Sequence, residues 1–183
     1  ICRLLQLRRV AFVASEKPEM SVSAKTNQVE ADMIAAMVER IFRQADRFDY
    51  SATVGVIVPY RNQIATVRNA IDRYGIPALH SITIDTVERF QGSQRDYIIY
   101  GLTVQQRYQL NFLTDNVFEE DGTLIDRKLN VAMTRARKHL TIVGNPDILA
   151  GSAVYRRLMD FMKSRGCYFN VACEKFCAGD FSV

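Results

Sequence analysis

The chain has 183 residues, of which 48% are hydrophobic and 24% charged, and its formal net charge is +4. This length and composition suit one folded domain with its own hydrophobic core, and they exclude a disordered or fibrous protein. No apolar run is long enough to span a bilayer and no signal peptide is visible, so we expect no membrane partner and a cytoplasmic location. The mildly basic charge permits nucleic-acid binding without demanding it. The first residue is Ile1, and we expect the sequence to begin inside a longer protein.

Apolar runs and helical spacings alternate along the first half of the chain. We expect strands at residues 10–14, 54–58 and 81–85. Between the first two, Asn27 can cap a helix, with Glu30 at the capping-box position three residues later. The expected apolar face of that helix consists of Ile34, Met37, Val38, Ile41 and Phe42. The helix after the second strand has an expected apolar face of Ile64, Val67 and Ile71.

The second half continues the alternation. We expect strands at residues 97–103 and 140–143, separated by a polar loop around residues 119–122 and a helix from about residue 125 to residue 137. The segment beyond Gly166 could be an edge strand or an ordered extension. A final amphipathic helix carries Val154, Leu158, Phe161 and Met162.

Strands that alternate with helices predict an α/β fold with a mostly parallel sheet covered by helices on both faces. We expect residues 1–183 to form a single domain, with a core at about 10–165 and a C-terminal extension at 166–183. Parallel sheets of this kind bind ligands at the carboxyl ends of their strands. The loops after residues 58, 85, 103 and 143 are therefore where we expect the chemistry.

Segment 127–137 is dense in arginine. Leu129, Ala132, Met133 and Ala136 share one helical face and can anchor it to the sheet, so Arg135 should project away from the core, near the ligand-binding edge. Guanidinium groups bind phosphate oxygens bidentately, which suits a phosphate site. A solvated basic face is the alternative.

Two other segments, 58–63 and 86–92, contain candidate ligand contacts. Tyr60 could stack on a base, or it could be an ordinary packed aromatic at a helix start. Gly92 could let a ligand approach the backbone, or it could serve only a tight turn.

Taken together, the three segments resemble the motor motifs of superfamily 1 helicases, in the branch of the RNA-surveillance and nuclease-fused DNA helicases. That family has a Pro-Tyr segment ending in Gln, then Phe-Gln-Gly, then Leu-Asn-Val-Ala-x-Thr-Arg-Ala-Arg. The third motif is nearly complete at residues 129–137, and the order and spacing also agree. The helix with Asn27, Glu30 and Ala31 fits the family as well, so the resemblance covers about residues 10–145.

The resemblance implies a RecA-like fold and one half of an ATP-driven motor. In such motors Arg135 would be the arginine finger, which neutralises charge that develops on the transferred γ-phosphoryl group. The expected nucleotide contacts are Tyr60, Gly92, Gln94 and Arg137. For Arg137 an ion pair with Asp96 is the alternative.

The same resemblance implies that this domain carries half of the track for a single strand of nucleic acid, with 5′ to 3′ polarity. Thr86, Pro59 and Thr103 are the expected strand contacts. We expect DNA in preference to RNA as the strand, and a monomeric protein.

The sequence lacks a phosphate loop and a strand that ends in Asp-Glu. ATP and Mg²⁺ would therefore be held mainly by an N-terminal RecA-like domain that is absent from this chain, and the chain alone should not hydrolyse ATP. A non-catalytic nucleic-acid-binding module on the same fold is the alternative, although such a module has no need of Arg135. No Gly-x-Gly-x-x-Gly follows a strand, which argues against a dinucleotide-binding enzyme.

The chain departs from the family pattern at four places. Val58 replaces a threonine, Glu88 an aspartate and Gln94 a glutamate. An amide at Gln94 can still accept a hydrogen bond from a ribose hydroxyl, but without charge. After the next strand the family often has a serine or cysteine and then Val-Arg, whereas this chain reads Gly101-Leu102-Thr103-Val104, which puts a nucleic-acid contact there in doubt.

Cys167, Cys173 and Cys177 lie close together in the sequence. Their spacing matches no standard zinc pattern and neither histidine is near, so we expect reduced thiols and no metal.

Overall fold

The computed structural model describes residues 9–18, 23–90, 92–115, 117–120 and 123–179. Its centre is a sheet of six parallel strands in the order β3-β2-β4-β7-β1-β8. The strands are β1 (Val10–Ala14), β2 (Val54–Ile57), β3 (Thr83–Asp85), β4 (Arg95–Gly101), β7 (Ala136–Gly144) and β8 (Tyr168–Asn170).

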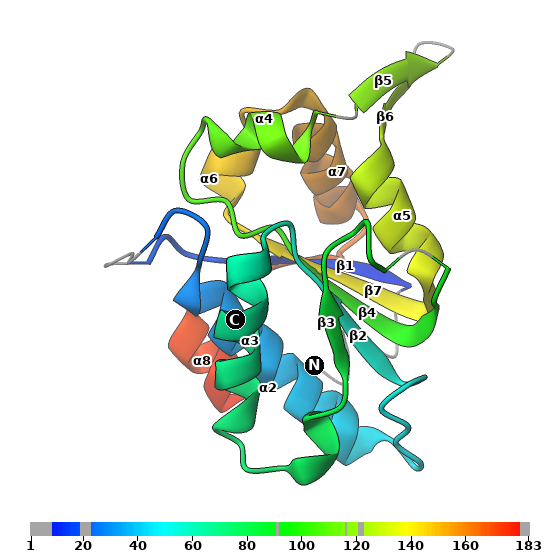
Figure 1. The fold of residues 1–183 in the computed structure, drawn as a ribbon. Coiled ribbons are helices and arrows are strands. Elements are labelled where there is room, and N and C mark those ends of the chain that lie inside the picture. Colours follow the sequence, from blue (N-terminus) through cyan, green and yellow to red (C-terminus); the bar gives the residue numbers. More distant parts are fainter. Residues whose placement is uncertain (1–8, 19–22, 91, 116, 121–122, 180–183) are drawn as a thin grey trace.

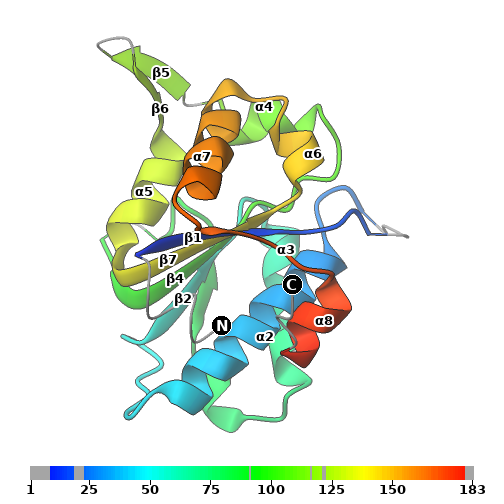
Figure 2. The same ribbon diagram turned by 180° about the vertical axis from the view of Figure 1, so that it is seen from behind.

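Helices cover both faces of this sheet (Figures 1 and 2). One face carries α2 (Gln28–Gln44), α3 (Arg61–Asp72) and α8 (Cys173–Ala178), with a short 3-10 helix at Pro77–Leu79. The other face carries α4 (Gln109–Leu113), α5 (Arg127–Arg135), α6 (Pro146–Leu149) and α7 (Ala153–Ser164). The predicted α/β fold of RecA-like type is confirmed.

The alternation of side chains along each strand builds two separate hydrophobic clusters. In β1, Ala11 and Val13 pack among the side chains of α2 and α3, whereas Phe12 packs on the opposite face. Because both faces are covered, β2 is buried along its whole length. This explains why its sequence is a continuous apolar run and not an alternating one.

Helix α2 begins as predicted but is capped differently. The Asn27 side chain accepts a hydrogen bond from the backbone N–H of Glu30 at 3.1 Å. The backbone N–H of Asn27 donates to Oε1 of Gln63 at 2.8 Å, so Glu30 does not complete the capping box. Its carboxyl group is buried and has other partners.

The expectation of a polar loop around residues 119–122 was wrong. The structure has an antiparallel hairpin of β5 (Val117–Glu120) and β6 (Thr123–Asp126), which projects from the body of the domain (Figure 1). Helix α5 therefore starts at Arg127, where Asp126 caps it by accepting from the N–H of Leu129 at 3.1 Å. It ends at Arg135, because Ala136 and the residues after it already pair with β4.

Two predicted helix faces need correction. Met133 of α5 is 45% exposed, although Leu129 and Ala132 are buried as expected. In α7, Phe161 is 54% exposed, and the buried side chains include Tyr155 and Met162.

The segment after Gly166 contains both structures that the sequence left open. Strand β8 pairs with β1 at the edge of the sheet, and α8 packs on α2. The guanidinium group of Arg40 donates to the backbone oxygens of Phe176 and Cys177, each at 2.8 Å. Phe176 is fully buried, so the C-terminal segment is part of the core.

Candidate nucleotide and nucleic-acid site

The predicted site residues fall on two opposite edges of the sheet. Because all six strands are parallel, their carboxyl ends share one edge and their amino ends share the other. Residues at the carboxyl edge are Pro59 and Tyr60 after β2, Thr86 after β3 and Thr103 after β4. Residues at the amino edge are Gly92 and Gln94 before β4, and Arg135 and Arg137 where β7 begins.

The expectation that Arg135 lies at the carboxyl edge was wrong. Helix α5 leads into β7 from its amino end, and β7 has 9 residues. At about 3.3 Å per residue, the two edges are roughly 30 Å apart along this strand.

The Arg135 side chain has no polar partner within the part of the chain that the structure describes. The residue is half-buried, and its Nε is enclosed without a hydrogen bond. No ion pair joins it to Glu88 or Asp96, so the structure gives no support to a structural ion-pair role. An enclosed N–H without a partner is uncommon and points to a partner supplied from elsewhere.

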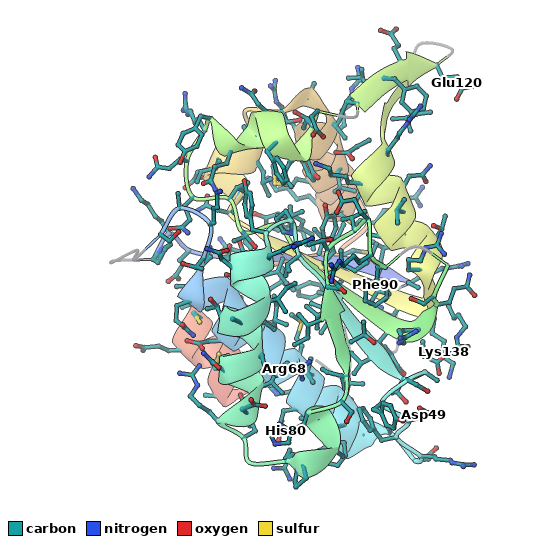
Figure 3. All side chains as sticks on the ribbon, viewed as in Figure 1. Asp49, Arg68, His80, Phe90, Glu120 and Lys138 are labelled. Carbon is teal, nitrogen blue, oxygen red and sulfur yellow. The ribbon has the colours of Figure 1, made fainter. Side chains whose placement is uncertain are left out.

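Arg137 makes the ion pair that the sequence left open as an alternative. Its Nε lies 2.9 Å from Oδ1 of Asp96, and its Nη2 donates to the backbone oxygen of Ala52 at 2.9 Å. Lys138 binds the other carboxylate oxygen of Asp96 at 2.7 Å. Figure 3 shows Lys138 at the end of the molecule where β4 and β7 begin, well away from Glu120 on the hairpin.

Gln94 connects the start of β4 to the end of α5. Its Nε2 donates to the backbone oxygen of Thr134 at 3.2 Å. Beside it lies a hollow of about 640 Å³ whose lining includes Arg9, Asn130 and Arg137. The hollow thus places an amide, a second amide and two guanidinium groups around one space.

The backbone conformation at position 92 favours glycine. Its φ is +83°, and nothing lies within 4 Å of the position that a Cβ would occupy. The positive φ supports the tight turn, and the open space beside the glycine leaves room for a ligand to approach the backbone, so both alternatives from the sequence stay open.

Phe90 fixes the turn between Thr86 and β4. Its ring is fully buried over Gly55 of β2, where an added Cβ would lie 2.5 Å from Cζ of the ring. The guanidinium group of Arg95 lies over the same ring, 5.5 Å from its centroid. Figure 3 shows Phe90 against the sheet, in the region between its two edges.

A buried carboxyl group organises the carboxyl edge, and sequence reasoning assigned it only a capping role. Oε2 of Glu30 accepts from the backbone N–H of Thr103 at 2.7 Å, and Oε1 accepts from Ser15 at 3.2 Å and from Nδ2 of Asn27 at 3.3 Å. Burial raises the pKa of Glu30 from 4.5 to about 8, while the Thr103 hydrogen bond acts in the opposite direction. Because Glu30 lies three residues after a helix cap, the sequence indicated a local capping box and gave no sign of its contact with Thr103.

The residues expected to contact a single strand of nucleic acid are more enclosed than expected. Thr103 is fully buried and Thr86 is 8% exposed. Pro59 is buried but lines a hollow at the surface. A strand could reach the side chain of Thr103 only if its loop moved.

Tyr60 is packed against another aromatic ring at the start of a helix, which is the second of the two roles that the sequence allowed. Its ring stacks on Phe112, with ring centroids 4.9 Å apart and planes 20° from parallel. Burial raises the pKa of its hydroxyl, which accepts a hydrogen bond from Gln109. It lies at the edge opposite to Gln94 and Arg135.

Two departures from the family pattern have a simple structural explanation. Val58 and Val104 are both fully buried, one in each hydrophobic cluster. Apolar side chains at these places pack in the core and cannot contact a strand.

Within the described residues, no group of three or more His, Cys, Asp and Glu side chains could hold a metal ion. The sulfur atoms of Cys173 and Cys177 are 3.9 Å apart, and Cys167 is buried. No helix in the described ranges is both long and apolar enough to cross a membrane.

Comparison with known proteins agrees with this architecture. A family model described as "AAA domain" matches residues 4–147. The helicase sen1 of Schizosaccharomyces pombe is 32% identical over 159 residues, which are 86% of this chain and 9% of that protein. The regulator of nonsense transcripts 1 homolog of Drosophila melanogaster is 32% identical over 167 residues, or 86% of this chain and 13% of that protein. Its Arabidopsis thaliana counterpart is 30% identical over 162 residues, or 85% of this chain and 12% of that protein.

The six-stranded parallel sheet and its motif segments define a RecA-like domain of the P-loop NTPase type. The chain belongs to the AAA-domain family, and its relatives are superfamily 1 helicases of the sen1 and nonsense-transcript-regulator kind. It spans about a tenth of the length of the relatives that it matches.

Proposed function

We propose that this chain is the C-terminal motor domain of an ATP-dependent helicase. In this proposal residues 1–183 form one domain that works against an N-terminal RecA-like domain of the same protein. That second domain holds most of the ATP and Mg²⁺, and the present chain contributes the arginine finger and half of the single-strand track. The protein would act as a monomer in the cytoplasm.

The observation that carries the proposal is the unpaired guanidinium group of Arg135 at the end of α5. It has no described partner, while Gln94 and Arg137 close by are each bound to backbone or carboxylate groups. An arginine without an internal partner is available to an anion brought by another domain. Its charge would act mainly in the transition state, on the transferred γ-phosphoryl group.

The remaining nucleotide candidates divide between the two edges. Gly92, Gln94 and Arg137 lie at the amino edge with Arg135, so they fit the nucleotide side of the proposal. For Arg137 to contact phosphate it would have to leave Asp96. Tyr60 lies at the carboxyl edge with Pro59, Thr86 and Thr103, the expected nucleic-acid contacts. We therefore propose that it contacts the nucleic acid and not the nucleotide.

Whether the bound nucleic acid is DNA or RNA stays a prediction. The sequence-based preference was DNA, whereas several relatives are named as regulators of nonsense transcripts. Transcripts are RNA, and we therefore propose RNA as the strand to test first, with matched DNA beside it.

The decisive experiment measures ATP hydrolysis by the intact two-domain protein with Arg135→Ala and Arg135→Lys. We expect both variants to lose on the order of a thousand-fold in kcat, because lysine lacks the planar fork of arginine. Melting temperature and strand affinity should stay at wild-type values. Arg43→Ala, which removes an exposed arginine of α2, is the control. Hydrolysis at the wild-type rate in Arg135→Ala would end the assignment of Arg135 as the arginine finger.

A further inference from the structure

Tyr108 is the most exposed large hydrophobic side chain in the described part of the chain. It directly precedes α4 and is 66% exposed. Its ring has neither a stacking nor a cation partner there, unlike the rings of Tyr60 and Phe112. Single exposed aromatics are common on protein surfaces, so the exposure gains meaning only from the surroundings.

Two hollows border Tyr108, one on each side. The first has a volume of about 500 Å³ and includes Pro59 and Tyr60 in its lining. The second has a volume of about 480 Å³ and includes Gln106 and Asn145. Tyr108 lines both, so the residue lies between two neighbouring spaces.

The backbone that presents Tyr108 is held from below by Gln109, which is only 3% exposed. Its Oε1 accepts from the N–H groups of Gln105 and Gln106, each at 2.9 Å. Its Nε2 donates to the backbone oxygen of Ala24 at 2.6 Å, which ties the loop after β1 to α4. A ring on a fixed backbone can serve as a contact surface at low entropic cost.

Phe112, which is 42% exposed, lines the first hollow together with Tyr108, but its ring already has partners. Tyr60 stacks on it, and Nζ of Lys128 lies 4.0 Å from its centroid. The Phe112 ring thus has an aromatic and a cationic partner already, whereas the more exposed Tyr108 ring has neither among the described residues.

Positive charge surrounds both hollows. Lys25 and Arg61 line the first hollow, and Lys17 and Arg107 line the second. All four are exposed, and none forms an ion pair with a described residue. Asp147 is the single acid in either lining. Cations on both sides of an aromatic ring match the alternation of phosphate and base along a single strand.

The arrangement lies at the carboxyl edge of the sheet, where the strand candidates also lie. The loop after β1, the start of α3 and the loop before α4 all lie at the end of the domain opposite to α5 (Figures 1 and 2). Ligands of open parallel sheets gather at this edge.

We propose that Tyr108 is a stacking platform for one base of a single-stranded nucleic acid, and that Lys25, Arg61, Lys17 and Arg107 bind the phosphates on either side of it. The inference rests on the proposed function, because it adds a contact to the same strand track. It assigns that contact to a residue outside the three motif segments.

The chain contains no tryptophan, so Tyr108→Trp introduces a single fluorescent reporter at the platform. Oligouridylate or oligothymidylate should quench its emission in a saturable manner, because the base stacks on the indole. Tyr50→Trp is the matched control: Tyr50 is 55% exposed and precedes β2, at the opposite edge. A strand of the same length made of abasic sugar-phosphate units should not quench either reporter.

Affinities measured by fluorescence anisotropy give the second readout. Tyr108→Ala should weaken strand binding on the order of ten-fold, whereas Tyr108→Phe should retain wild-type affinity. The alanine variant should also discriminate less than wild type between the normal and the abasic strand, because the stacking contact at Tyr108 is lost.

The outcomes separate this inference from the proposed function. If the wild-type chain binds single strands but Tyr108→Ala binds them equally well, or if the abasic strand quenches the reporter, the stacking platform is refuted alone. If the wild-type chain binds no single strand at all, the strand track is refuted with it. Quenching by polyglutamate as strong as that by nucleic acid would identify a surface for an acidic protein and overturn the proposal.

Discussion

The carboxyl group of Glu30 accepts a hydrogen bond from the backbone N–H of Thr103, 73 residues later in the chain. Thr103 has a φ of +59°, and among the described residues it is the one non-glycine with a positive φ. This conformation is costly for a β-branched residue and persists only where the surroundings hold it. Glu30 is thus a positioning residue for the loop between β4 and α4, which leads to Tyr108.

The pKa of Glu30 predicts a pH dependence of stability. The folded chain keeps this carboxyl protonated up to about pH 8, whereas the unfolded chain ionises it near 4.5. The protonated carboxyl therefore contributes its full stabilisation of the fold below pH 4.5, and this contribution is lost as the pH rises through 8. Between these two values the free energy of unfolding should fall by about 1.4 kcal/mol per pH unit. Denaturant titrations across this range should show a falling free energy of unfolding.

Replacing Glu30 tests whether this carboxyl causes the slope. Glu30→Gln should flatten it, because the neutral amide can accept from Thr103 and donate to Ser15 at every pH. Glu88→Gln, at an exposed position, should leave the slope unchanged. An equal slope in wild type and Glu30→Gln would show that another group titrates.

Arg137 and Arg135 should respond differently to removal. The ion pair of Arg137 with Asp96 is solvent-exposed, so a double-mutant cycle of Arg137→Ala and Asp96→Ala should give a coupling free energy below about 1 kcal/mol. Arg135→Ala should not lower the melting temperature, because no described residue pairs with it. A fall in melting temperature that Arg135→Lys reverses would instead reveal a structural role for Arg135.

Gly55→Ala should destabilise the chain by about 1–3 kcal/mol, because the added methyl would overlap the buried ring of Phe90. Thermal unfolding of the single variant measures this cost. The double variant Gly55→Ala with Phe90→Leu should recover part of the loss, since leucine leaves room for the methyl. No recovery would mean that the overlap lies with Arg95, the other side chain near this position.

The isolated chain should show no ATP hydrolysis, and its affinity for single strands should fall as salt rises. It lacks a phosphate loop, and its net charge of +4 supplies few phosphate contacts. A plot of the logarithm of the affinity against that of the salt concentration should therefore have a shallow negative slope. Magnesium-dependent turnover by the pure chain would contradict the expected absence of a complete nucleotide site.

The sequence predicted where the strands of the sheet lie, because each contains an apolar run, but it missed some of their bounds. Strand β4 spans residues 95–101 and not 97–103, and β7 begins at Ala136 and not at residue 140, because both strands have charged residues near their start that an apolar run does not reveal. The sequence failed where function depended on which end of a strand a residue occupies. Arg135 was placed at the edge where ligands usually gather, although a helix that precedes a strand must deliver its last residue to the amino end.

Long-range contacts were the second source of error. Glu30 fits a local capping pattern, and nothing in the spacing indicates that Thr103 is its partner. Met133 and Phe161 follow the helical period, yet both side chains are exposed. Such outcomes depend on the packed tertiary structure, which local periodicity does not encode.

The position of β1 has a consequence for the order in which the domain can fold. It is the earliest described strand in the chain, but its two neighbours in the sheet are β7 and β8, the latest ones. Val10 pairs with Leu140, so β1 must wait for more than a hundred residues of synthesis before either partner exists. Until Gly144 has left the ribosome, both backbone edges of this apolar strand are unpaired, and the edge that pairs with β8 stays open to misfolding or to a chaperone until Asn170 has emerged. We expect the sheet to close only after synthesis of the domain is complete.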